Sequence, residues 1–178
     1  GLQQCIDNVA KSLNFNEKVK PSSPDRLRGK GIAVMWKAPA MPPNAGSSAW
    51  VELSEDGNVT VGLGGQELGQ GTFTVMAQMA ASALGVPYET VRIAGPVDTQ
   101  YSPYEWQTVA SRLTWSMGNA VRLAASDARR QILEMVAEAW NEKIEDLDIV
   151  NGIVVSYKSE QETPLSNIVI YGMPTKND

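Results

Sequence analysis

The glycine-rich stretch at residues 64–71, GGQELGQG, constrains the fold of this chain more than any other feature. It lies between a strand-like run at 59–63 and a helix-like run at 72–84 that is rich in alanine and methionine. Glycine lets a backbone approach a ligand closely, and the N-terminus of a helix attracts negative charge. The junction therefore indicates either an anion-binding turn or a turn in which glycine only serves the sharp change of direction.

A second polar loop, at residues 98–112, also leads directly into a predicted helix. That helix is expected over 111–140, because apolar residues recur there at helical spacing, and Ser111 is a candidate for its N-cap. Small residues such as Gly118 and Ala124 predict that the helix packs closely against a sheet or a neighbouring helix.

The rest of the chain consists of short predicted elements separated by proline and glycine. We expect a helix over 1–13, followed by a connector to residue 28. Three antiparallel strands are expected over 31–38, 47–53 and 59–63, and a short strand over 91–94. Near the end we expect a hairpin of 148–150 and 153–157 across Asn151 and Gly152, and a segment at 164–171 that fits either a helix or a strand.

This order predicts an α+β fold class, with a largely antiparallel sheet and helices packed on one face. We expect two parts: an N-terminal helix with its connector at residues 1–28, and a main domain at residues 29–178.

The composition excludes several classes of protein. Fifteen Lys and Arg residues against twenty Asp and Glu give a net charge of −5, which argues against a nucleic-acid-binding surface. The one basic cluster, at residues 20–30, is small and typical of a solvated connector. No apolar run approaches the length of a membrane span, and residues 1–4 do not resemble a signal peptide.

The chain has no histidine and one cysteine, Cys5. These counts rule out an internal disulfide, a zinc site of ordinary ligands and a Ser-His-Asp triad, so any metal must come with a cofactor. A single cysteine fits a reducing compartment, and we expect a cytoplasmic protein. The first residue is Gly1 and not methionine, so we also expect a piece of a longer polypeptide.

The two loops together resemble the molybdenum-binding subunit of the xanthine dehydrogenase and aldehyde oxidoreductase family. The resemblance covers most of residues 29–130, with both loops in the expected order and spacing. It is carried by residues 64–71 followed by Thr72, Phe73 and Thr74, by Gln78, by Leu84 to Pro87, by Asp98 and Thr99, and by Thr108 to Arg112.

This resemblance implies that residues 29–178 are a fragment of a molybdopterin-binding domain. Its cofactor is a molybdopterin that carries Mo, in bacterial members usually as the cytosine dinucleotide. The first loop is then expected to bind the pterin and pyrophosphate through backbone N–H groups and the Gln70 amide, and the second to approach the pterin and Mo through Ala110 and Ser111. The residues implied are Gly69, Gln70, Gly71, Thr72, Thr74, Thr108, Val109, Ala110 and Ser111.

The resemblance also implies an activity and partners for the whole enzyme. Such an enzyme hydroxylates an aldehyde or an N-heterocycle with oxygen from water, and electrons pass through iron–sulfur clusters and flavin held by partner domains or subunits. Its catalytic base is a glutamate C-terminal to the region seen here. Neither Glu67 nor Glu105 stands in that motif, so no catalytic residue is expected in this chain, and the isolated fragment is expected to be inactive.

Two other classes of function stay open on the sequence alone. A phosphate- or nucleotide-binding module of the P-loop type would need a lysine after the glycine turn, where Gln70, Gly71 and Thr72 supply none. An interaction domain would use its glycines only as turn residues and would expose docking aromatics, for which Trp36, Trp50, Trp106 and Trp115 are candidates.

Overall fold

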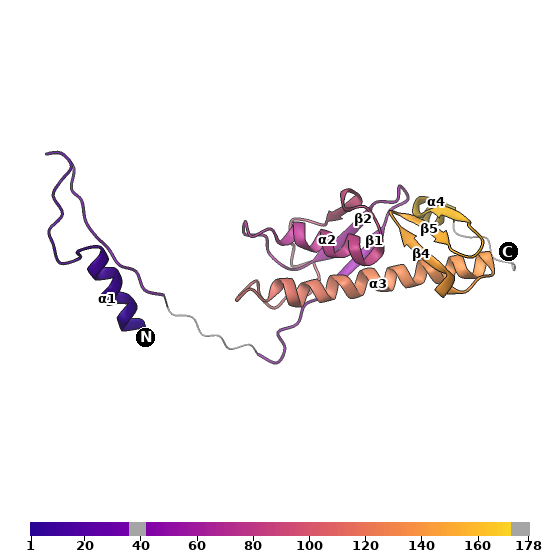
Figure 1. The fold of residues 1–178 in the computed structure, drawn as a ribbon, viewed down its shortest axis with the longest axis horizontal. Helices are drawn as coiled ribbons and strands as arrows, with labels where there is room; N and C mark the ends of the chain where they lie inside the picture. The colour runs from indigo at the N-terminus through magenta and orange to yellow at the C-terminus, as the bar shows by residue number, and fades with distance from the viewer. Residues whose placement is uncertain (36–41, 172–178) are drawn as a thin grey trace. The chain divides into compact units, whose positions relative to one another are not determined.

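The structure is a computed structural model that describes residues 1–35 and 42–171 (Figure 1). The chain groups into two compact units, Gly1–Ala40 and Met41–Asp178. The sequence-based division between residues 28 and 29 stays a prediction about domains.

The first unit contains the helix α1, Leu2–Ser12, which confirms the helix expected over 1–13. Leu2, Ile6 and Val9 of α1 line a hollow of about 310 Å³ together with residues 31–35. The strand expected over 31–38 is wrong for residues 31–35, which have no strand structure and line the hollow beside α1. Residues 36–38 lie outside the described part.

The second unit begins with a hairpin of β1, Ala49–Leu53, and β2, Val59–Leu63, which confirms the expected pair. After β2 the chain passes through the glycine-rich loop into α2, Thr72–Leu84, and a short 3₁₀ helix, Tyr88–Thr90, leads to β3, Val91–Ile93. β3 pairs with β2 in parallel, because the intervening α2 carries the chain back along the sheet before the third strand begins.

The helices α2 and α3, Leu113–Trp140, lie side by side and cover one face of this sheet (Figure 1). Their contact is close, because a Cβ at Gly118 would lie 2.5 Å from the sulfur of Met79. The side chains that fill the space between sheet and helices are buried and almost all aliphatic; they include Val59, Val61, Leu63, Met76, Ala80, Leu84, Met117 and Val121.

A second, antiparallel sheet contains β4, Leu147–Val150, β5, Ile153–Ser156, and β6, Glu162–Pro164. A 3₁₀ helix, Ile144–Asp146, precedes β4. Asn151 and Gly152 form the predicted two-residue turn, with φ angles of 52° and 78° that match a type I′ hairpin. The ambiguous segment at 164–171 is mostly the helix α4, Leu165–Tyr171.

The predicted α+β class is confirmed, with helices on one face of a mainly antiparallel arrangement. Two details differ: the strands form two small sheets, and β2 and β3 are parallel. The expected N-cap at Ser111 is wrong, because α3 begins at Leu113 and Ser111 has a φ of 56°. None of the helices in the described residues has the length and apolarity that a membrane crossing needs.

Candidate functional site

The first loop carries its own carboxylate at the N-terminus of α2. Glu67 Oε1 accepts hydrogen bonds from the N–H groups of Gly69 at 2.7 Å and Gly71 at 3.0 Å, and Oε2 accepts one from Phe73 at 3.1 Å. Gly69 and Gly71 have φ angles of 99° and 82°, in the left-handed region that favours glycine. The negative charge of Glu67 therefore lies where the dipole of α2 stabilises it.

The N–H groups that the resemblance implies for cofactor binding have a partner within the chain in this structure. Those of Gly69 and Gly71 are both donated to Glu67, and their role towards a cofactor stays a prediction. The N–H of Phe73 first, and then that of Gly71, lowers the pKa of the Glu67 carboxyl below its usual value of 4.5. An acidic residue just before a helix is a capping signal, and sequence reasoning gave Glu67 no such role.

The side chain of Gln70 stabilises the turn through hydrogen bonds to neighbouring residues. Its Oε1 accepts a hydrogen bond from the N–H of Leu68 at 2.6 Å, and its Nε2 donates to the carbonyl oxygen of Gln66 at 2.8 Å and to Thr72 Oγ1 at 2.7 Å. Thr72 is buried, whereas Gln70 is exposed and Thr74 lies exposed on the first turn of α2. Of these three residues, Gln70 and Thr74 are exposed, and both amide hydrogens of Gln70 are donated within the turn.

The second loop is anchored by a buried ion pair between Arg112 and Glu105, whose side chains are 8% and 3% exposed. The Arg112 guanidinium also donates to the carbonyl oxygens of Ala45 at 2.7 Å and Gln107 at 2.9 Å, and to Ser116 Oγ at 2.6 Å. Arg112 therefore connects the segment before β1, the second loop and the first turn of α3. Sequence reasoning assigned Glu105 no role; besides Arg112, Glu105 accepts a hydrogen bond from the hydroxyl of Ser47, which is 58 residues away in the chain.

Ala110 and Ser111 precede Arg112 and are consecutive residues with positive φ angles, 51° and 56°. This conformation costs a residue other than glycine roughly 1–3 kcal/mol and persists only where surrounding contacts enforce it. Both residues are exposed. The contacts of Arg112 hold this strained segment out towards solvent at the N-terminal end of α3.

The two loops lie side by side. The N–H of Gln66 donates to Thr108 Oγ1 at 2.9 Å, and a Cβ at Gly64 would lie 2.2 Å from the carbonyl oxygen of Pro103. The two loops are therefore adjacent in the structure, as the binding of one cofactor by both would require. Whether they bind a cofactor remains a prediction.

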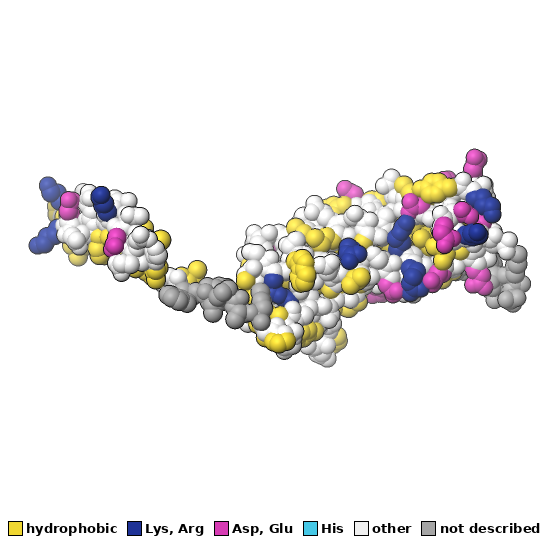
Figure 2. All heavy atoms as spheres, turned by 60° about the horizontal axis from the view of Figure 1, so that its bottom comes forward, with side chains coloured by type: hydrophobic (Ala, Val, Ile, Leu, Met, Phe, Trp, Pro, Cys, Tyr) yellow, Lys and Arg dark blue, Asp and Glu magenta, His cyan; other side chains and the backbone are white. Residues whose placement is uncertain are grey.

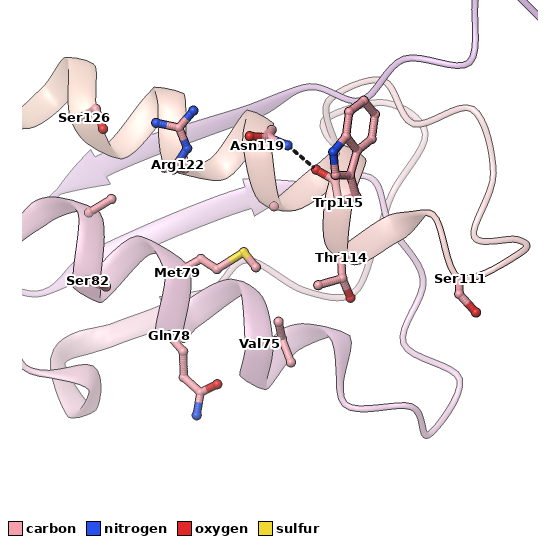
Figure 3. Close-up of a pocket in the computed structure, with 12 residues that line it drawn as sticks. Val75, Gln78, Met79, Ser82, Ser111, Thr114, Trp115, Asn119, Arg122 and Ser126 are labelled. Atoms are coloured by element: carbon pink, nitrogen blue, oxygen red, sulfur yellow. Dashed lines mark hydrogen bonds between the residues drawn. The ribbon is translucent and has the colours of Figure 1, made fainter.

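A groove of about 830 Å³ runs between α2 and α3, beginning at Ser111 (Figure 3). Figure 3 shows both helices running in the same direction along it, so their N-terminal ends lie at the same end. Trp115 is 76% exposed beside the groove, and Arg122 is the one charged residue among those that line it. The remaining lining side chains include hydroxyls and amides, from Gln78, Ser82, Thr114, Asn119 and Ser126.

On the face of the second unit that Figure 2 shows, charged side chains are unevenly distributed. They gather over the end that holds the C-terminal part of α3, whereas the opposite end shows mostly apolar and uncharged atoms. The two loops and the groove entrance lie at that less charged end. A ligand there would meet mainly neutral donors and acceptors.

The nine predicted site residues belong to this one region. Thr72 is buried, Gly71, Thr108 and Val109 are half-buried, and Gly69, Gln70, Thr74, Ala110 and Ser111 are exposed. Their individual roles stay predictions. Within the described residues, no group of three or more His, Cys, Asp or Glu side chains could hold a metal ion directly.

The model of the molybdopterin cofactor-binding domain family matches residues 8–174. The chain therefore belongs to this family of domains, as its two loops indicated.

Two curated relatives and one crystal structure show how the chain compares with complete proteins. The xanthine dehydrogenase molybdenum-binding subunit of Escherichia coli O157:H7 is 26% identical over 171 residues, covering 93% of this chain and 23% of the relative. The isoquinoline 1-oxidoreductase subunit beta of Brevundimonas diminuta is 29% identical over 136 residues, covering 73% of this chain and 17% of the relative. Quinoline 2-oxidoreductase of Pseudomonas putida 86 matches with a TM-score of 0.62 and 30% identity, over 69% of this chain and 16% of that one. The chain thus spans less than a quarter of the length of these relatives.

Proposed function

We propose that the chain binds molybdopterin through its two loops, as part of an oxidoreductase subunit of the molybdenum hydroxylase type. The observation that carries this proposal is the contact between Gln66 and Thr108, which joins two loops at positions 42 residues apart in the sequence. Ser111 of the second loop also lines the groove between α2 and α3. Membership of the molybdopterin cofactor-binding family supports it.

The donor set fits a pterin. The edge of a pterin ring presents neutral donors and acceptors like those of an amide. The Ser111 hydroxyl can pair with both kinds, and Gln70 Oε1, which accepts one hydrogen bond from Leu68, can accept a second one from a donor of the ring. No atom lies within 4 Å of a Cβ built at Gly69 or Gly71, so a ligand can approach the backbone of the turn closely.

The cytosine dinucleotide form is our proposal for the cofactor, and the groove supports it. A nucleotide combines a flat ring with an anionic phosphate. The exposed Trp115 indole offers a stacking surface for the ring, and Arg122 offers a cation for the phosphate. The volume of about 830 Å³ lies within the usual range for small-molecule sites.

When bound, the molybdenum cofactor would supply the hydroxylation of an aldehyde or N-heterocycle with oxygen from water, and electrons would leave through iron–sulfur and flavin groups of partner domains or subunits. The part assigned to this chain is to hold and orient the cofactor. Gln70 and Ser111 would place the cofactor between the loops, and Arg112 would keep Ala110 and Ser111 in their exposed, left-handed conformation near the groove.

The test is the molybdenum and pterin content of the complete subunit that contains this chain. Gln70→Ala and Ser111→Ala should each lower both contents roughly five- to ten-fold, because each removes hydrogen bonds to the cofactor. Gln100→Ala is the matched control, since Gln100 lies exposed in the same second loop. Unchanged contents in both variants would contradict the proposed site.

The interaction-domain alternative finds less support. Trp50 stacks over Gly62, and Trp106 lies 5.7 Å from the Arg112 guanidinium, so both are engaged within the domain. Trp36 lies outside the described residues. Trp115 alone of the three described candidates is mostly exposed, and it borders the proposed cofactor groove.

A further inference from the structure

We infer that Glu67 is a positioning residue of the first loop. Its carboxylate occupies the anion-binding end of α2, so that the turn contacts a neutral part of the cofactor through the Gln70 amide and does not bind the phosphate of the cofactor. This inference rests on the proposed function, because it concerns how the same loop meets its ligand. It differs from the sequence-based expectation, in which N–H groups of residues 69–71 bind pyrophosphate.

The first step of the argument is the occupancy of the donors. A helix N-terminus binds phosphate because its N–H groups lack partners within the helix. At α2 the N–H groups of Gly69, Gly71 and Phe73 are all donated to the two oxygens of Glu67. A phosphate at this position would have to displace a carboxylate that three hydrogen bonds hold, or else lie beside it and be repelled by its charge.

The second step concerns the shape of the turn. Glu67 accepts the N–H groups of residues 69, 71 and 73, and Gln70 accepts the N–H of Leu68, the residue that precedes them. The exposed Gln70 amide is therefore fixed on a turn whose backbone Glu67 fixes. Loss of the carboxylate would release three donors together and, with them, the geometry that presents Gln70.

The third step is that the groove offers another place for an anion. Arg122 lines the groove between α2 and α3, and it is the one cation among the lining residues. A cofactor with both a pterin and a phosphate can therefore place its neutral ring at Gln70 and its charge beside Arg122, without removing Glu67.

The first experiment follows backbone amide signals of the chain by NMR while inorganic pyrophosphate is added at neutral pH. In the wild type the signals of Gly69, Gly71 and Phe73 should stay in place. In Glu67→Ala all three should shift, because the variant exposes three donors at a helix N-terminus. In Glu67→Gln, which keeps the size of the side chain and one acceptor oxygen, the Phe73 signal should shift most.

Pyrophosphate shifts at these three amides in the wild type would overturn the inference, as would their absence in both variants. If Glu67→Ala does not fold, Glu67→Gln still decides the question, since its shape is nearly unchanged. A merely structural role of Glu67 would change stability without creating a pyrophosphate response.

The second experiment measures cofactor retention by the complete subunit. Glu67→Gln should lower the bound pterin about ten-fold, in the range seen when a group that orients a ligand residue is removed. Glu55→Gln is the control, because Glu55 lies exposed in the β1–β2 turn and forms no ion pair among the described residues. Equal pterin in the two variants would overturn the positioning role, whereas a wild-type subunit without any pterin would overturn the proposed function and leave the NMR result to decide on Glu67.

Discussion

At the scale of single residues, Arg112 and Glu105 form the anchor on which the second loop depends. Their side chains are almost completely buried, and Arg112 reaches acceptors in three separate segments. A buried charge is tolerated only when its partner and further hydrogen bonds compensate for lost hydration. The strained conformation of Ala110 and Ser111 follows from this anchor and not from their own preferences.

Glu105→Gln should therefore destabilise the domain by about 3–5 kcal/mol, because it leaves the Arg112 charge buried without its counter-ion. The measurement is the free energy of unfolding in urea. Asp127→Asn is the control, since Asp127 pairs with Arg130 on an exposed part of α3, where such a pair contributes about 0–1 kcal/mol. Similar losses in the two variants would contradict the anchoring role.

Glu67 gives a prediction for pH. The pKa of its carboxyl is lower in the folded chain than its usual value of 4.5, so its charge stabilises the fold above that value. This contribution is lost as the pH falls through the lower folded pKa. The wild type should therefore unfold at a higher temperature than Glu67→Gln near pH 7, and the difference between the two unfolding temperatures should become smaller well below pH 4.5. A difference that is constant with pH would contradict the role of the Glu67 carboxylate as a helix cap.

At the scale of elements, the parallel pair of α2 and α3 determines the groove. Their close approach depends on Gly118, which lies against the side chain of Met79, and both residues line the groove. Larger residues at such a contact force off-rotamer side chains or separate the helices. The width of the groove is therefore set by two residues that are 39 positions apart in the sequence.

Gly118→Val should cost about 1–3 kcal/mol of stability, because a branched side chain would overlap the Met79 sulfur. Gly118→Ala should cost less, since the end of Met79 is flexible and alanine favours a helix by about 1 kcal/mol over glycine. Thermal unfolding of the two variants tests this order. A valine variant as stable as the alanine variant would show that the helices are not in close contact at Gly118.

At the scale of the whole molecule, this chain belongs to the molybdopterin cofactor-binding domain family and spans less than a quarter of the length of the relatives that it matches. The loops and groove present mainly neutral donors at an end with few charges. No catalytic residue is assigned to the chain, since the resemblance implies a glutamate outside it. We propose that this chain binds the cofactor and that another segment of the subunit carries out the proton transfer.

Purified chain of residues 1–178 should accordingly show no oxidation of aldehydes or purines with a dye acceptor, and no bound molybdenum. The complete subunit assayed in parallel is the control for the assay. Turnover by the chain alone would contradict this division, because it would require a catalytic base within residues 1–178.

Local chemistry in the sequence is sufficient to determine several elements. The run at residues 72–84, rich in alanine and methionine, predicted α2, and Asn151 with Gly152 predicted the β4–β5 hairpin. These features depend on neighbouring residues, so one sequence contains all the information they need. The two glycine and serine loops also carried the resemblance that led to the family.

Only the tertiary structure decided which distant residues meet. Three contacts depend on how α2 and α3 pack on the sheet: the parallel pairing of β3, the contact of Gln66 with Thr108, and the hydrogen bond by which the Arg112 anchor reaches Ala45. The left-handed Ser111, which displaces the expected N-cap, follows from that anchor. The occupied N-terminus of α2 likewise depends on the tertiary structure, because a glutamate before a glycine turn can face solvent or fold back onto the turn, and the backbone geometry at Gly69 and Gly71 determines which it does.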